Sequence, residues 1–62
     1  MKTFEGWSNR AVRLFTLARE YEKSNNFKAA LRNYMHLTEE NLGEDRKKVM
    51  EKIAELRLKT GN

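Results

Sequence analysis

The break at Ser24-Asn25-Asn26 constrains the fold more than any other feature of the sequence. It interrupts "LAREYEKSNNFKAALRNYMHL", residues 17–37, which is helical in pattern on both sides of the break. Asparagine is the commonest substitute for glycine in a left-handed position, so Asn25 can end the first helix. The side-chain oxygen of Asn26 can then cap the next helix by accepting from first-turn amides. Two helices joined by so short a break are expected to lie antiparallel.

Apolar residues follow a helical period in three segments, at about 3–23, 27–42 and 44–59. Steps of three and four place them on one side of each segment, as expected for amphipathic helices. These apolar stripes consist of Trp7, Ala11, Leu14, Ala18 and Tyr21; Phe27, Ala30, Leu31, Tyr34, Leu37 and Thr38; and Val49, Ile53 and Leu56. The stripes need one another as packing partners, because isolated helices of this length are marginal in water.

A second turn is predicted at Gly43, since glycine takes the left-handed conformation of a helix terminus without steric cost. Glu44 and Asp45 would then open the third helix, where acidic residues complement the helix dipole. Small Ala18 and Ala30 would allow the first two helices to approach closely. The prediction is an all-α fold, an antiparallel three-helix bundle.

Length and composition limit the chain to one domain, residues 1–62, which can also be the N-terminal module of a longer protein. There are no cysteines, so disulfides, thiolate metal sites and cysteine nucleophiles are excluded. No apolar run approaches the roughly 18 residues that span a bilayer, and residues 1–7 lack the apolar stretch of a signal peptide. We expect a soluble, cytoplasmic chain that is monomeric in isolation.

The inventory of catalytic residues is poor. His36 is the only histidine, and a metal site needs several ligands of that kind. The paired carboxylates at 39–40 and 44–45 are adjacent in sequence, and adjacent positions do not face each other on a helix. The three glycines are too scattered for a phosphate-binding loop. We therefore predict no enzyme, no catalytic residues, no cofactor and no metal.

The net charge of +4 suggests an acidic partner. The excess lies within residues 1–38, because residues 39–62 carry equal numbers of both signs. Nucleic acid is one such partner, and the residues that could line a surface for it are Arg10, Arg13, Arg19, Lys23, Lys28 and Arg32. The aromatic residues fall on the apolar stripes, which favours a core role over base stacking. A solvated basic face is therefore the preferred interpretation.

The residues around the break follow the spacing of a tetratricopeptide-type hairpin, namely Leu14, Leu17, Ala18, Tyr21, Asn25, Phe27, Ala30, Tyr34 and Leu37. Glycine is usual at the position of Asn25, and alanine at that of Leu37. One hairpin followed by a single third helix resembles the microtubule-interacting and trafficking domain. The hairpin is similar to that of katanin-type severing ATPases, and "DRKKVMEKIAELRLK", residues 45–59, resembles the family's closing helix. The resemblance covers about residues 10–59.

This resemblance implies an adaptor that binds short peptides between its helices and brings an attached enzyme, such as an ATPase, to trafficking or cytoskeletal targets. Carried over to this chain, the binding site lies between the second and third helices and consists of Arg32, Met35, Leu42, Lys47, Met50, Ala54 and Arg57. The residues give a similar site independently, because flexible methionines beside the main stripes suit an adaptable binding surface. Filling of gaps in the core would explain the methionines equally well.

The predicted function is recognition of short acidic peptides by a protein-interaction module. Three alternatives remain open: a small basic nucleic-acid-binding bundle, a fragment of a tetratricopeptide array, and a designed bundle without a ligand. The first would lose affinity steeply with salt. The second would expose an apolar face and self-associate or unfold alone. The third would be unusually stable to heat and bind nothing.

Overall fold

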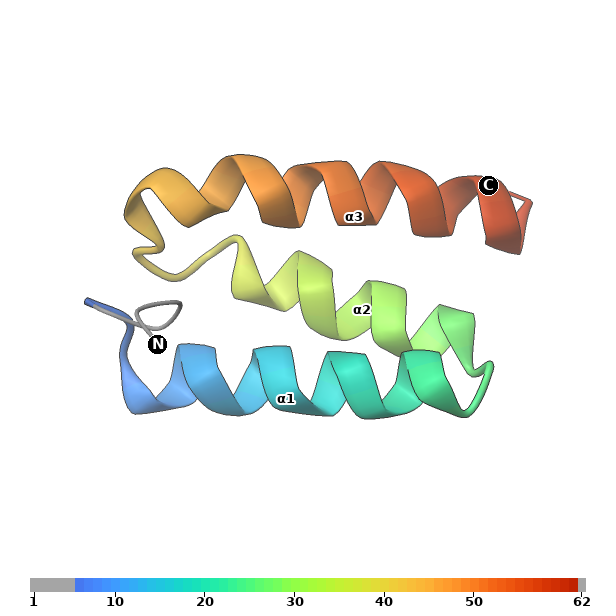
Figure 1. The fold of residues 1–62 in the computed structure, drawn as a ribbon, viewed down its shortest axis with the longest axis horizontal. Coiled ribbons are helices and arrows are strands. Elements are labelled where there is room, and N and C mark those ends of the chain that lie inside the picture. The colour runs from blue at the N-terminus through green and yellow to red at the C-terminus, as the bar shows by residue number, and fades with distance from the viewer. Residues whose placement is uncertain (1–5, 62) are drawn as a thin grey trace.

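The computed structural model describes residues 6–61, which form three α-helices: α1 (Asn9–Lys23), α2 (Phe27–Leu37) and α3 (Arg46–Thr60). A 3₁₀ turn, η1 (Gly43–Asp45), precedes α3, and residues 6–61 contain no strand. Successive helices run in opposite directions (Figure 1). The predicted all-α, antiparallel three-helix bundle is confirmed. None of the helices in this part of the chain is both long and apolar enough to cross a bilayer.

The helix α2 is the central element of the bundle. It lies between α1 and α3 and packs against both of them (Figure 1). Contacts between α1 and α3 are made by side chains, for example by the ion pair of Glu22 with Lys52. Two surfaces between helices follow from this arrangement, one between α2 and α3 and the other between α1 and α3.

Most of the core comes from the predicted apolar stripes, but Leu42 lies outside those stripes and Tyr21 of the first stripe is exposed. The buried members of the core are Ala11, Ala18, Ala30, Leu31, Tyr34, Leu37, Leu42, Val49, Ile53 and Leu56. Ala18 and Ala30 are both 0% exposed, which confirms that small residues lie where α1 and α2 meet. Trp7, Leu14, Phe15 and Phe27 pack around the core while remaining partly exposed.

The turn between α1 and α2 confirms the predicted role of Asn25, whose φ of 64° is left-handed. The backbone N–H of Asn25 donates to the carbonyl of Glu22 (3.0 Å), and that of Asn26 to the carbonyl of Tyr21 (2.9 Å). These two bonds form a Schellman motif, which satisfies carbonyls at the end of α1. The predicted side-chain cap by Asn26 is wrong, because its side chain makes no capping hydrogen bond. Its backbone (φ −90°, ψ 72°) is not in the extended conformation that favours a cap.

The start of α1 differs from the prediction, which placed it at about residue 3. The helix begins at Asn9, and Ser8 is its N-cap, with the backbone N–H of Ala11 donating to Ser8 Oγ (3.1 Å). Gly6 has a φ of 84°, which does not fit a helix. The remaining predicted residues, 3–5, lie outside the described part of the chain.

The end of α2 is also earlier than predicted, at Leu37 instead of residue 42. The N–H groups of Glu39 and Glu40 donate three residues back, which tightens the end of the helix. The chain then turns so that Leu42 enters the core, where it is 4% exposed. Gly43 has the predicted left-handed φ of 61°, but it opens η1 and does not end α2. Glu44 and Asp45 accordingly belong to η1, and α3 covers 46–60 instead of 44–59.

We expect Asn25→Gly to leave stability unchanged or to raise it, and Asn25→Val to lower it by about 1 kcal/mol or more, since a β-branched residue is strained at positive φ. Thermal melts of the two variants measure this difference. Asn26→Val is the control, because its φ of −90° is open to any residue. If valine were tolerated equally at both positions, the left-handed turn would not contribute to stability.

Candidate functional site

A groove between α2 and α3 brings together four of the seven residues of the predicted binding site. This α2–α3 groove has a volume of about 750 Å³. Its lining consists of Lys28, Leu31, Arg32, Met35, His36, Thr38, Glu39, Met50, Ile53 and Arg57. The groove forms because α2 and α3 are adjacent antiparallel helices, so the side chains that flank their buried stripes face a common channel.

The other three predicted residues lie elsewhere. Lys47 lines a smaller, neighbouring depression of about 480 Å³, which shares Met50 with the α2–α3 groove. Leu42 is buried in the core and does not reach the surface. Ala54 is exposed on α3 but is not part of the lining of either depression.

The two methionines of the α2–α3 groove are exposed to solvent. Met35 is 44% exposed and Met50 is 52% exposed, so neither fills a gap in the core. Leu31 and Ile53, which line the same groove, belong to the core and form its apolar floor. The groove therefore offers flexible apolar side chains above a fixed apolar base.

Positive charge dominates the border of this groove. Lys28, Arg32 and Arg57 line it, and none of the three forms a salt bridge within residues 6–61. Glu39 is the one carboxylate among the described lining residues. A partner with carboxylates would thus meet cations that form no ion pair with the described residues.

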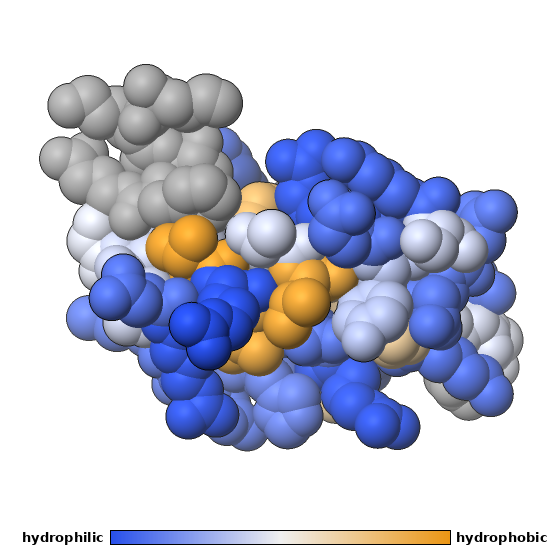
Figure 2. Space-filling model, turned by 90° about the horizontal axis from the view of Figure 1, so that it is seen from below, coloured by the Kyte–Doolittle hydropathy of each residue, from blue (hydrophilic) through white to orange (hydrophobic). Residues whose placement is uncertain are grey.

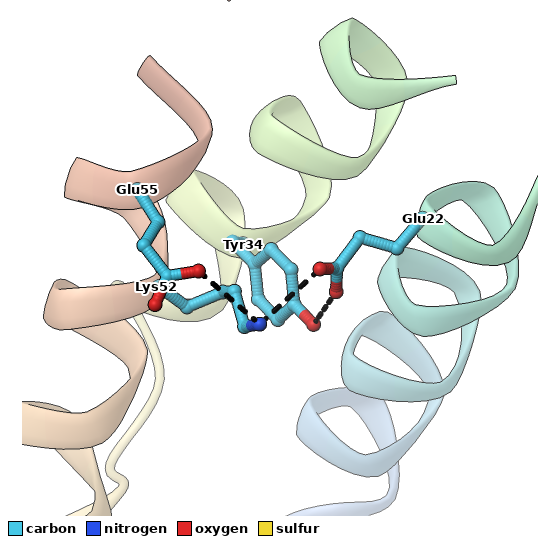
Figure 3. Close-up of polar contacts among 4 residues, drawn as sticks. All are labelled: Glu22, Tyr34, Lys52 and Glu55. Carbon is cyan, nitrogen blue, oxygen red and sulfur yellow. Dashed lines mark hydrogen bonds and ion pairs between the residues drawn. The ribbon is translucent and has the colours of Figure 1, made fainter. Parts of the chain in front are cut away.

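A polar network outside the lining of the α2–α3 groove joins all three helices (Figure 3). The Tyr34 hydroxyl of α2 donates to Glu22 Oε1 of α1 (2.8 Å), and Lys52 Nζ of α3 donates to Glu22 Oε2 (3.2 Å). Lys52 Nζ also lies 3.8 Å from Glu55 Oε1. Burial raises the pKa of the Tyr34 phenol, and the neighbouring Glu22 carboxylate raises it further. Local spacing could not have revealed this network, because Glu22 and Lys52 lie far apart in sequence.

The segment before α1 is fixed to the connection between α2 and α3. Trp7 Nε1 donates to Asp45 Oδ2 (3.1 Å), and Ser8 Oγ donates to Glu40 Oε1 (3.1 Å). Arg10 lies 3.6 Å from the second oxygen of Glu40. Because of these contacts, the partly buried carboxylates at 40 and 45 are hydrogen-bonded within the fold and do not simply form a solvated acidic stretch.

The outer face of α1 carries hydrophobic side chains among charged ones (Figure 2). Leu17 and Tyr21 are the exposed large apolar residues of this helix.

No group of three or more His, Asp or Glu side chains within residues 6–61 is arranged to hold a metal ion.

Comparisons of the chain with protein-family models, with curated proteins and with solved structures found no match in any of the three. The chemistry of the α2–α3 groove is therefore the basis on which a function can be proposed.

We expect Tyr34→Phe to lower the free energy of unfolding by about 1.5–3 kcal/mol, because it removes a hydrogen bond to the charged Glu22 acceptor. Urea denaturation at pH 7 measures the loss. The pKa of Tyr34 is raised in the folded state. The stabilisation is therefore fully present when the pH is below the pKa of the unfolded chain, about 10, and it is lost as the pH rises above that pKa.

Tyr21→Phe is the matched control, because Tyr21 is exposed and its change should fall within about 0.5 kcal/mol. Equal losses in the two variants would contradict a specific contribution from the Tyr34 hydroxyl.

Proposed function

We propose that this chain is a protein-interaction module that binds short acidic peptides in the α2–α3 groove. The observation that carries the proposal is the pairing of two half-exposed methionines, Met35 and Met50, with a border of cations that have no salt bridge among the described residues. Large exposed apolar side chains in a concave, charged setting are typical of binding surfaces.

Apolar contacts and charges have different tasks in the proposed mechanism. Apolar side chains of the peptide pack on Met35 and Met50, whose unbranched side chains adapt to the shape of the partner. The peptide's carboxylates pair with Arg32 and Arg57 at the border and thereby select acidic sequences. A helical peptide would present such contacts at intervals of three and four residues along the groove.

The resemblance of residues 10–59 to the microtubule-interacting and trafficking domain supports an adaptor role. In that role the module recruits an attached ATPase or other enzyme to trafficking or cytoskeletal targets. The groove lies between α2 and α3, which are consecutive helices of one chain, so peptide binding does not require a second copy of the chain.

The test is a titration of ¹⁵N-labelled protein with an acidic amphipathic peptide, and separately with short DNA and RNA, each at two salt concentrations. We expect peptide-dependent amide shifts confined to α2 and α3. Met50→Ala should speed dissociation by about tenfold, and Arg57→Glu should mainly slow association and reduce the salt dependence. Stopped-flow binding separates the two rates.

Two matched controls lie on α3 outside the α2–α3 groove. Leu58→Ala removes an exposed apolar side chain, and Lys48→Glu reverses an exposed charge. Neither should change peptide binding beyond about twofold, since neither side chain lines the α2–α3 groove.

Other outcomes would overturn the proposal. Shifts centred on α1 with nucleic acid alone, and lost at high salt, would identify a nucleic-acid-binding bundle, because phosphate contacts dominate such affinity. Self-association of the free chain through the α1 face, with no peptide binding, would instead favour a fragment of a repeat array.

A further inference from the structure

The surface between α1 and α3 forms a second groove that the proposed peptide site does not use. This α1–α3 groove has a volume of about 540 Å³ and shares no lining residue with the α2–α3 groove. Tyr34 of α2 contributes to its lining, together with Phe15 of α1 and Val49 of α3. Its volume lies in the range of about 300–1,000 Å³ that is usual for small-molecule sites.

Aromatic rings line this groove in a continuous series. Trp7 meets Phe15 edge to face, with ring centroids 5.6 Å apart, and Phe15 meets Tyr34 in the same manner at 6.0 Å. Such rings present a rigid apolar surface, which loses little conformational entropy when a ligand packs on it. The groove is thus suited to the apolar body of a small molecule.

The acidic groups of the groove are already engaged by hydrogen bonds. Glu22 accepts from the Tyr34 hydroxyl and from Lys52, and Asp45 accepts from the indole N–H of Trp7. Both carboxylates therefore accept hydrogen bonds from protein donors, and Lys52 partly neutralises the charge of Glu22.

Of the four basic residues that line the groove, Lys23 and Lys52 form ion pairs with glutamates. Arg19 of α1 lies over the Phe15 ring, with its guanidinium carbon 5.9 Å from the ring centroid. Lys48 of α3 lines the same groove, and neither cation forms a salt bridge within residues 6–61. The two helices that flank the groove therefore each supply one cation that can accept an anionic partner.

We propose that the α1–α3 groove binds a small amphipathic organic anion. Its apolar body packs on Phe15, Tyr34 and Val49, and its carboxylate lies between Arg19 and Lys48. The two cations indicate the class of ligand. A neutral apolar molecule would form no ion pair with Arg19 or Lys48, and a cationic molecule would be repelled by both. The inference is independent of the proposed peptide function, which uses other residues.

The test compares naphthalene-2-carboxylate with the neutral naphthalene-2-carboxamide, which has nearly the same shape. In ¹H–¹⁵N spectra of the labelled protein, the carboxylate should shift amides around Phe15, Tyr34 and Val49. Arg19→Gln and Lys48→Gln should each weaken carboxylate binding by about two- to fivefold, as expected for a partly exposed ion pair. Neither variant should change the weaker binding of the carboxamide.

Lys47→Gln is the matched control, because it removes the same charge from the neighbouring position of α3 but lines a different depression. It should bind the carboxylate like the parent chain. Circular dichroism melts of all variants check that each remains folded.

Three results would overturn the inference. Equal affinity for the carboxylate and the carboxamide would show that the cations do not select an anion. Shifts scattered over all three helices would indicate nonspecific binding, and a loss in Lys47→Gln as large as in Lys48→Gln would indicate that net charge alone is responsible. Peptide binding in the α2–α3 groove could persist in each of these cases, so the two proposals fail separately.

Discussion

Replacing Leu56 by alanine should lower the free energy of unfolding by about 2–5 kcal/mol, the range for a leucine truncated in a packed core. Leu56 is 0% exposed and is one of the largest fully buried side chains of the described residues. A single core of this size rarely supplies more than about 3–5 kcal/mol, so the variant should be largely unfolded at 37 °C. Thermal and urea melts followed by circular dichroism measure the loss.

The matched control for this prediction lies two residues further along α3. Leu58→Ala makes the same chemical change at a side chain that is 84% exposed, and it should alter stability by less than about 0.5 kcal/mol. If both substitutions had the same effect, helix propensity and not core packing would govern the stability of α3.

Enlarging Ala18 to leucine should destabilise the fold by about 1–3 kcal/mol, because the added methyl groups must force α1 away from α2. Ala18 has no exposed surface and lies in the same core cluster as Ala30 of α2. Leucine is nearly as good a helix former as alanine, so a loss of stability would come from packing alone. Urea denaturation monitored by Trp7 fluorescence and by circular dichroism provides two readouts.

Ala54→Leu is the corresponding control, since Ala54 is exposed on α3. We expect the free energy of unfolding of the Ala54→Leu variant to stay within about 0.5 kcal/mol of that of the parent chain. A stabilised Ala18→Leu variant would mean that α1 and α2 do not approach closely at this point.

The sequence predicts the helices and their order because apolar periodicity and turn residues act locally. Asn25 shows this well, since its conformational preference and its place between two periodic segments were sufficient to locate the turn. The small size of Ala18 and Ala30 likewise predicted that both lie in the packed core, where both are 0% exposed.

Helix ends were harder to predict because tertiary contacts decide them. The guanidinium of Arg46 donates to the carbonyl of Thr38, which satisfies a group left free at the end of α2. Glu40 pairs with Ser8 and Arg10 at the start of α1, and Leu42 enters the core. These contacts cannot be seen in local periodicity, so the prediction from periodicity placed the end of α2 too late in the chain. The start of α1 was readable in principle, because Gly6 and Ser8 are a breaker and a good N-cap.

The candidate site was predicted in part. Arg32, Met35, Met50 and Arg57 share a groove because they flank the buried stripes of adjacent helices. Leu42 was misplaced with the end of α2, and the α1–α3 groove was not foreseen. That groove depends on how α1 and α3 are packed relative to α2, and local sequence patterns do not predict this packing.

The central position of α2 has a consequence for the folding kinetics. Each pair of packed helices is joined directly in the chain, so every main contact closes only a short loop (Figure 1). The entropy lost in closing a loop grows with its length, and here it is small for both connections. Low contact order of this kind is associated with folding in microseconds to milliseconds. The arrangement that leaves one groove between α2 and α3 and another between α1 and α3 is therefore also one that the chain can reach without a long-range search.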